Sequence, residues 1–330
     1  KINIRRNNIG MDIKVNSKYG IAAVSGKINI SNMKNPVYSL KGKMNNVDIS
    51  GISGNIEDKS NLNSSFDING SGIGLNNLTG RFNFDVGNSV YSGFQIPNTK
   101  INANLNLTAD SGSIQVTNKA MEMDANGTFS LYELVDAILY NISSFSNIAE
   151  KKLFPDTSSY NADINRYNHS GNVNIKYKFI TKDSMELKKL TSPLGIVFNG
   201  DINGRLTNSK DEFNSTSSVI INKFIYHDTI LVLNNFKSNI VFSNDYRKLS
   251  DEEPLSSFAL NMYMNADRIM IDSGKYDSLQ ALLTLSESLA NLDFKGRIQP
   301  LNYAMIKSAV DMRGDQTVFT VDSLYAKYFD

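Results

Sequence analysis

Apolar and polar residues alternate with a period of two through most of this 330-residue chain. Every second residue from Ile101 to Leu107 is Ile, Ala or Leu, and each residue between them is Asn. A strand with this pattern has one apolar and one wet face, which is typical of antiparallel sheets rather than of a parallel α/β sheet. Asn-Gly and Ser-Gly pairs between such runs favour hairpin turns. We therefore expect a mainly β protein, a long curled antiparallel sheet built from repeated meanders.

Two segments depart from this alternation. Residues 130–154 have apolar residues at helical spacing, begin with Ser130 and Glu133 in the S-x-x-E capping arrangement, and stop at a proline. This pattern predicts an amphipathic helix, whose apolar positions are Leu131, Leu134, Val135, Ile138, Ile142 and Phe145. Residues 300–312, which begin with proline and precede Gly314, are predicted to form a second, short helix. Residues 278–292 fit either a helix or alternating strands.

A faint internal repeat suggests the domain organisation. Stretches that begin at Gly127 and Gly296 each combine a strand end with a predicted helix start, and each follows a hairpin that begins with Tyr. We interpret residues 1–157 as a first β-groove repeat ending in the amphipathic helix, and residues 158–330 as a second repeat ending in the short helix. The polar stretch 158–169 marks the boundary. Since the chain starts inside a predicted strand, we expect it to be a fragment of a longer protein.

Composition gives little support for catalysis. The chain has 34 Lys and Arg against 33 Asp and Glu, so it lacks the basic footprint of a nucleic-acid binder. It has no Cys and two His, and no phosphate-binding loop or hydrolase motif, so we expect neither enzyme activity nor a metal or cofactor. The carboxylates of Asp201, Asp211, Glu212 and residues 251–253 are interpreted as solvated loop groups. No apolar run is long enough to span a bilayer as a helix.

The apolar strand faces must be buried, because exposing them costs roughly 25 cal/mol per Å². Two sheets closing on each other as a sandwich would achieve this, and composition alone favours that arrangement. One sheet curling around a groove that a ligand fills is the second solution, and the Met residues on the strands suit such an adaptable lining.

Residues 40–107 favour the groove. They contain four short motifs: N-V-D-I at 46–49, S-x-L-N at 60–63, a G-x-G…L-x-x-L-x-G region at 70–80, and Y-S-G at 91–93. In these motifs the segment resembles the repeats of the AsmA/TamB superfamily of envelope proteins, and residues 197–242 give a second, weaker match. The likeness covers about two thirds of the chain, and the abundant Asn and low charge are similar to Bacteroidota-type members.

This resemblance implies a periplasmic protein anchored to the inner membrane of a Gram-negative bacterium. It further implies a lipid-transfer conduit between the inner and outer membranes, in which a hydrophobic β-groove shields the acyl chains of phospholipid or another acyl lipid. An Omp85-type barrel in the outer membrane is the implied protein partner. The residues expected to line the lipid groove are Phe82, Phe84, Val86, Ile101, Ala103, Leu105, Leu107, Met121, Met123, Val173, Ile175, Tyr177, Phe179, Leu260, Met262 and Met264.

Two other interpretations stay open. The first is a non-enzymatic envelope scaffold or outer-membrane protein assembly factor, with a closed β core and partner binding at its edge strands. The second is a fragment of an outer-membrane barrel, since alternating strands of about ten residues also fit that class. The helix predicted over 130–154 departs from the family pattern, because it would plug or cap an open groove.

Overall fold

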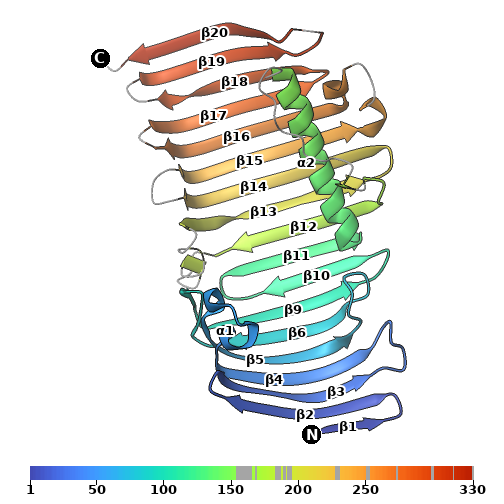
Figure 1. Ribbon diagram of the computed structural model, residues 1–330. Helices are drawn as coiled ribbons and strands as arrows, with labels where there is room; N and C mark the ends of the chain where they lie inside the picture. The colour runs from blue at the N-terminus through green and yellow to red at the C-terminus, as the bar shows by residue number, and fades with distance from the viewer. Residues whose placement is uncertain are drawn as a thin grey trace. The chain divides into compact units, whose positions relative to one another are not determined.

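The computed structural model describes residues 1–153, 166–167, 169–182, 187–188, 191, 195–226, 231–249, 253–272, 274–298, 301–314 and 316–328. Within this part of the chain, twenty strands form one antiparallel sheet that is not closed into a barrel, accompanied by one helix of more than a single turn (Figure 1). The expected mainly β fold, a long antiparallel sheet, is confirmed. Contacts divide the chain into two compact units: unit 1 comprises residues 1–126 and 179–198, and unit 2 comprises residues 127–178 and 199–330.

Unit 1 is a meander of strands with short connections. Its strands are β1 (Ile2–Arg5), β2 (Asn8–Ser17), β3 (Gly20–Asn29), β4 (Val37–Val47), β5 (Ser60–Ser71), β6 (Thr79–Val86), β7 (Ser89–Tyr91), β8 (Phe94–Ile96), β9 (Thr99–Leu107) and β10 (Gly112–Thr117). Strands β1 to β6 pair in chain order, β9 pairs with β6 and β10, and the short β7–β8 hairpin joins β5. Helix α1 (Ser50–Ser53) and the 3-10 turn η1 (Ile56–Asp58) lie between β4 and β5.

The register of unit 1 gathers apolar side chains on one face. Val24, Gly42, Phe66, Phe84 and Ile101 lie directly opposite one another across five successive strands, and opposed residues share a face of the sheet. Applied to every pair, this register defines the apolar face of unit 1: Ile2, Ile4, Ile9, Met11, Ile13, Val15, Ala22, Val24, Ile28, Tyr38, Leu40, Met44, Phe66, Ile68, Phe82, Phe84, Val86, Ile101, Ala103, Leu105, Ile114 and Val116.

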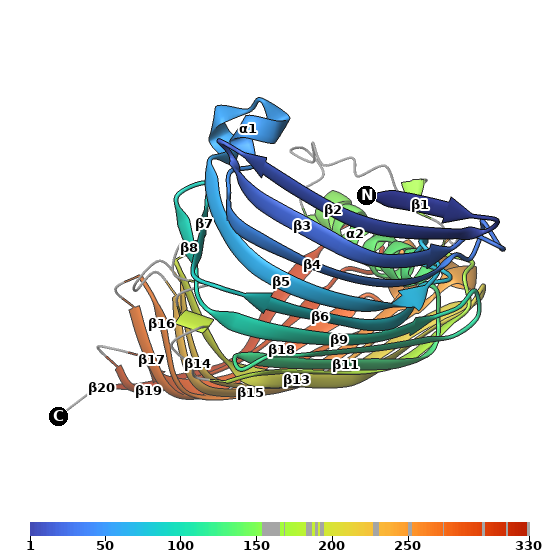
Figure 2. The ribbon, with the colours of Figure 1, turned by 90° about the horizontal axis from the view of Figure 1, so that it is seen from below.

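Strands β2 to β6 bend along their length (Figure 2). Glycines on the apolar face of unit 1 let neighbouring strands approach closely. Gly70 and Gly80 lie opposite each other, and Gly80 has φ +153°, a conformation that L side chains rarely adopt. A Cβ added to Gly80 would lie 2.3 Å from the carbonyl oxygen of Asn69. Backbone atoms therefore occupy the space that a side chain at this position would need.

We expect Gly80→Ala to lower the free energy of unfolding by about 1–3 kcal/mol, because the backbone must shift to admit the new methyl group. Urea denaturation followed by circular dichroism measures this loss. The matched control is Gly93→Asn, since Gly93 has φ +82° with no atom within 4 Å of the position that a Cβ would take, and Asn tolerates that conformation. Equal midpoints for the two variants would contradict the packing described for Gly80.

Unit 2 contains the long helix and the longest strands. Its elements are α2 (Leu131–Leu153), β14 (Glu212–Tyr226), β15 (Leu231–Asp245), η4 (Tyr246–Lys248), η5 (Pro254–Ser257), β16 (Phe258–Ile271), β17 (Gly274–Ser286), β18 (Leu289–Ile298), β19 (Leu301–Asp311) and β20 (Val318–Tyr328). Strands β14 to β20 pair in chain order. Three further strands, β11 (Met121–Thr128), β12 (Val173–Thr181) and β13 (Ile196–Asn208), have residues in both units.

The register of unit 2 also separates the two faces. Phe242, Leu260, Leu285, Ala290 and Val310 lie opposite one another across β15 to β19. The apolar face of unit 2 is defined by this row and its neighbours: Phe213, Val219, Ile221, Phe236, Ile240, Phe242, Phe258, Leu260, Met262, Met264, Ala266, Leu279, Ala281, Leu283, Leu285, Ala290, Leu292, Phe294, Ala304, Ile306 and Val310. Helix α2 runs across the strands of this unit (Figure 1).

The two helix predictions have different outcomes. The helix expected over 130–154 is present as α2, and the Ser130 hydroxyl accepts a hydrogen bond from the Glu133 N–H at 3.2 Å, as a capping residue does. The helix expected over 300–312 is wrong, because Leu301–Asp311 forms β19 between β18 and β20. Hydrogen-bonded pairing of β19 with β18 and with β20 outweighs the helix signals of the Pro and Gly that flank this segment.

The ambiguous segment 278–292 is a β hairpin. Strand β17 ends at Ser286 and β18 begins at Leu289, and the two residues between them, Glu287 and Ser288, have φ +49° and +62°. Positive φ at both central positions is typical of the tight turns that suit twisted hairpins. Since β19 is a strand, the resemblance between the stretches at Gly127 and Gly296 does not extend to a shared helix. Residues 158–165 of the expected domain boundary lie outside the described residues, and that boundary stays a prediction.

Candidate functional site

Strands β6 and β9 place six of the predicted groove residues together. Phe82 lies opposite Ala103 and Phe84 opposite Ile101, while Leu105 lies opposite Gly80. With Val86, all of these side chains are half-buried on the apolar face of unit 1. Leu107, at the end of β9, is instead buried, with 3% of its surface exposed.

The opposite face of the same strands is polar. Asn102, Asn104 and Asn106 alternate with the apolar residues of β9 and are exposed. Ion pairs cross between strands on this side, with Lys100 Nζ 3.7 Å from Asp85 and Lys41 Nζ 3.1 Å from Asp67. Their side chains are largely exposed, so these pairs contribute little stability. Unit 1 thus has one wet face and one apolar face.

Within the described residues of unit 1, no second sheet or long helix covers the apolar face. Its fully buried apolar residues are few: Val47, Leu107, Ala120, Ala125 and Leu187. Towards the first strands the face becomes exposed, with 63% of Ile2, 66% of Ile4 and 53% of Val15 accessible. Apolar patches of this extent on soluble proteins usually mark a binding surface.

Strand β11 continues the alternation. The Gln115 amide donates a hydrogen bond to the Asp124 carboxylate at 3.0 Å, which places Asp124 on the polar face with Gln115. Met123 therefore points to the other face, where it is 39% exposed, and Met121 is half-buried. Both predicted Met residues lie on the side of β11 opposite Asp124, and Met123 is the more exposed of the two.

Strand β12 carries four predicted residues with different degrees of burial. Val173 and Ile175 are each only 3% exposed, whereas Tyr177 and Phe179 are half-buried. The Tyr177 hydroxyl lies 2.6 Å from the Ser217 hydroxyl on the apolar face of unit 2. Val173 and Ile175 are therefore sealed in packing, and they are less able to contact a ligand than Tyr177.

Strand β16 places Leu260, Met262 and Met264 on the apolar face of unit 2. Met262 lies opposite Leu283 and Met264 opposite Ala281. All three predicted residues are half-buried, while Tyr263 on the other face of the same strand is 44% exposed. These side chains are accessible enough to contact a ligand.

Helix α2 packs on the apolar face of unit 2 through aromatic contacts. The ring of Phe145 meets Phe258 at 5.3 Å and Phe242 at 6.2 Å, both edge to face. Phe258 belongs to a buried cluster with Leu255, Leu285 and Met312. In unit 2, α2 therefore covers part of the face that the strands present.

The burial of α2 corrects one expectation. Val135 and Ile142, expected on its buried apolar side, are 48% and 58% exposed. Asn141 and Ser144 are buried instead, each with 2% of its surface exposed. Apolar residues cover more than one side of this helix, and polar partners on the strands and loops of unit 2 determine which side faces inward.

Those partners form a buried hydrogen-bond network. The Asn141 amide donates to the Tyr246 hydroxyl at 2.7 Å and to the Ala137 carbonyl at 2.8 Å. The Tyr246 hydroxyl donates to Asn208 at 2.6 Å, and Asn244 donates to Asn141 at 2.9 Å. Such a network fixes the rotation and position of the helix because every alternative leaves buried polar groups unpaired.

We expect Tyr246→Phe to lower the free energy of unfolding by about 1–3 kcal/mol, since it removes the hydroxyl that accepts from the Asn141 amide and donates to the side-chain oxygen of Asn208 in a buried site. Chemical denaturation measures the difference. Tyr263→Phe is the matched control, because Tyr263 is exposed on the polar face. If the two substitutions have the same small effect, the network does not hold α2 in place.

Burial also makes the stability of unit 2 sensitive to alkaline pH. Loss of solvent raises the pKa of Tyr246 well above its ordinary value of 10.0. The unfolded chain then loses this proton first, so the stabilisation is complete below about pH 10 and declines as the pH rises further. We expect the unfolding midpoint between about pH 9 and pH 11 to fall more steeply in the wild type than in Tyr246→Phe. Parallel pH profiles would contradict this assignment.

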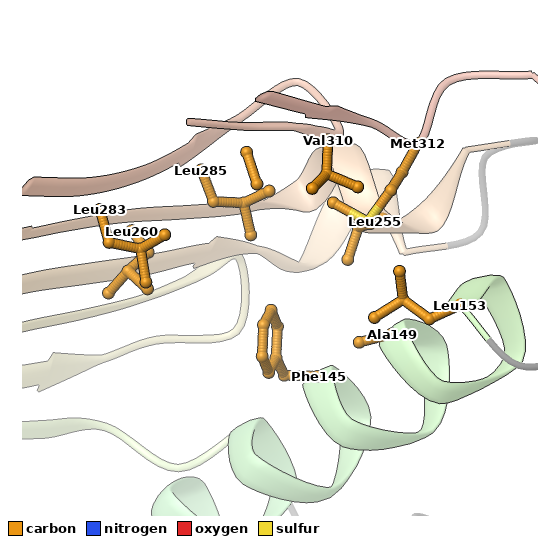
Figure 3. A pocket seen from close by; sticks show the side chains of 10 residues that line it. Phe145, Ala149, Leu153, Leu255, Leu260, Leu283, Leu285, Val310 and Met312 are labelled. Atoms are coloured by element: carbon orange, nitrogen blue, oxygen red, sulfur yellow. The ribbon is translucent and has the colours of Figure 1, made fainter. Parts of the chain in front are cut away.

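An apolar cavity of about 210 Å³ lies between the C-terminal half of α2 and strands β16 to β19 (Figure 3). Phe145, Ala149 and Leu153 of α2 point towards it, and the strands and the turn η5 supply the other wall. The complete lining consists of Phe145, Ala149, Leu153, Leu255, Leu260, Leu283, Leu285, Ala290, Val310 and Met312. Of these ten residues, only Leu260 was among the predicted groove-lining residues, because the cavity depends on how the helix packs on the sheet.

Chemically reactive groups do not converge in the described part of the chain. No group of three or more His, Cys, Asp or Glu residues there has the geometry of a metal site. His169 stacks on Tyr140 at 4.4 Å and meets Tyr246 at 4.8 Å, and burial lowers its pKa, so it serves in packing. His227 and residues 251–252 lie outside the described residues, and Asp211 and Glu212 donate backbone N–H groups to Ser209 in a surface turn.

Fold and site together define a class: an antiparallel sheet with one apolar and one polar face in each unit, and an apolar cavity beneath a helix in unit 2. No described helix combines the length and the hydropathy needed to cross a membrane. No family model, curated protein or solved structure matches this chain.

Proposed function

We propose that this chain is a non-enzymatic conduit for acyl lipids, in which the apolar faces of the sheet shield acyl chains while headgroups stay in water. The observation that carries the proposal is the apolar face of unit 1, which is half-buried at β6 and β9 and has no second layer among the described residues of that unit. A closed sandwich would bury these side chains almost completely.

The physical mechanism is replacement of solvent. An acyl chain laid on this face removes both its own methylene groups and the protein side chains from water, at about 0.8 kcal/mol per methylene group. The face contains hydrocarbon groups from Phe, Ile, Leu, Val and Met, so it binds by area rather than by directed hydrogen bonds. A lipid can therefore shift along the face without breaking a fixed set of contacts.

The cellular setting is part of the same proposal. The motifs within residues 40–107 resemble AsmA/TamB repeats, which supports a periplasmic location, anchorage to the inner membrane of a Gram-negative bacterium, and transfer of phospholipid towards the outer membrane. An Omp85-type barrel is the proposed protein partner there. The near-neutral net charge of +1 gives no support for a nucleic-acid partner.

Native mass spectrometry after detergent-free purification tests this function. The conduit predicts adducts with the masses of phospholipids, released by mild activation, and further adducts after incubation with phosphatidylethanolamine vesicles. A lipid-free spectrum under both conditions would overturn it.

One observation favours a scaffold as the second candidate. Among the described strands, β20 pairs only with β19, and its Phe319 and Leu324 are 65% and 68% exposed. An open edge with apolar side chains suits addition of a partner strand. A lipid-free protein that forms stable complexes through this edge would support the scaffold instead of the conduit.

A further inference from the structure

We propose that the cavity beneath α2 is a binding site for the methyl end of a single acyl chain. This inference rests on the proposed function, because it takes the ligand to be an acyl lipid. It adds a defined holding site in unit 2, whereas the apolar face of unit 1 has no second layer among the described residues of unit 1.

The chemistry of the lining selects a hydrocarbon. Every lining side chain is Phe, Ala, Leu, Val or Met, so none offers a hydrogen bond. A peptide entering the cavity would bring backbone amides that lose their water without gaining a partner, which is costly, whereas an acyl chain brings no such groups. The volume of about 210 Å³ exceeds the roughly 150 Å³ of an engineered apolar cavity that binds benzene, so several methylene groups fit.

The cavity continues into the apolar face of unit 2. Leu260 and Leu285 line the cavity and lie opposite each other, and Leu283, also in the lining, lies between Met262 and Leu292 in the next row. Met262 and Leu292 are half-buried rather than sealed. An acyl chain whose methyl end occupies the cavity can therefore extend along the apolar face of unit 2 towards Met262 without crossing polar groups.

Polar contacts hold the helical wall in place. The Lys152 ammonium donates to the carbonyl of Gly314, and the Thr317 hydroxyl donates to the Lys152 carbonyl at 3.2 Å. Glu253 accepts from the Gly314 N–H at 2.7 Å. These bonds tie the end of α2 to Gly314 and Thr317, so the helical wall of the cavity is preformed. A preformed site loses less entropy when a ligand binds.

Photolabelling tests the site directly. The intact chain is incubated with vesicles of phosphatidylethanolamine whose acyl chains carry a diazirine at the methyl end, and labelled peptides are mapped after irradiation. We expect labels on β17 near Leu283 and on α2 near Leu153. Ala149→Phe fills the cavity from the helix side and should reduce these labels at least tenfold. This is the loss of affinity expected when about two methylene groups of the ligand no longer fit.

Matched variants separate the outcomes. Leu139→Phe adds bulk to an exposed position of α2 and should leave the labels unchanged. Val310→Phe fills the cavity from β19, and it replaces Ala149→Phe if that variant does not fold. Undiminished labels on β17 in a folded filled variant overturn the site. Labels on β6 and β9 with none on β17 overturn the site but not the conduit, and labels in neither unit overturn both.

Discussion

Leu105→Asp is expected to weaken acyl-lipid binding to unit 1 on the order of 100-fold. Leu105 is half-buried on the apolar face, opposite Gly80 on one side and Ile114 on the other. A carboxylate at this point must stay hydrated, so it excludes a hydrocarbon chain from this part of the face. Placing a charge in a hydrocarbon environment costs about 2.5–3.5 kcal/mol on insertion scales, which corresponds to this loss of affinity.

Asn104→Asp is the matched control, because it adds the same charge to the neighbouring residue on the polar face. Binding is measured by photolabelling of β6 and β9 with the diazirine lipid, and circular dichroism establishes that both variants are folded. The conduit predicts loss of labelling for Leu105→Asp alone. Normal labelling of folded Leu105→Asp would remove this residue from the lipid surface.

The largest effect on stability is expected for Phe258→Ala, which should lower the free energy of unfolding by about 3–5 kcal/mol. Phe258 is 1% exposed and lies against Phe145 of α2 and Phe242 of β15. Its removal leaves a cavity between helix and sheet and breaks two aromatic contacts. Thermal and urea denaturation measure the loss.

Phe319→Ala is the control for this prediction, since Phe319 is 65% exposed and its removal opens no cavity. It should change the unfolding free energy by less than about 0.5 kcal/mol. A Phe258→Ala variant as stable as the control would show that α2 is not anchored by this cluster.

Alternation was sufficient to predict strands such as β9 and β16 and the side on which their apolar residues lie. In β9 the side chains of Ile101, Ala103 and Leu105 share one half-buried face and the Asn residues between them are exposed. This success has a simple physical cause, because the side chains of a strand point to opposite faces in turn. Any register that pairs two such strands with their apolar faces aligned produces the same result.

Local sequence pattern did not predict whether a second sheet covers the apolar face or leaves it open. Composition favoured two sheets closed on each other, but the described residues of unit 1 supply a single layer. Alternation is the same in both arrangements, so it cannot distinguish a strand that faces a second sheet from one that faces a ligand. Only the half-buried state of residues such as Phe84 separates them.

Helices were harder to place from the sequence. For residues 300–312 the flanking Pro and Gly indicated a helix, but pairing of β19 with two neighbours prevailed. For α2 the periodicity predicted the helix but not which side of it is buried. Asn141 faces inward because it donates a hydrogen bond to Tyr246, which is 105 positions away in the chain. The cavity beneath α2 depends on this docking, and no local pattern signals it.

The central claim is that acyl chains lie on the apolar face of unit 1, and fluorescence quenching measures it directly. The chain has no Trp, so Phe84→Trp and Asn83→Trp each introduce a single reporter, on the apolar face and the polar face respectively. Phospholipid with brominated acyl chains should strongly quench the Phe84→Trp variant and leave Asn83→Trp nearly unchanged. Equal quenching of the two variants, or none in either, would contradict the claim.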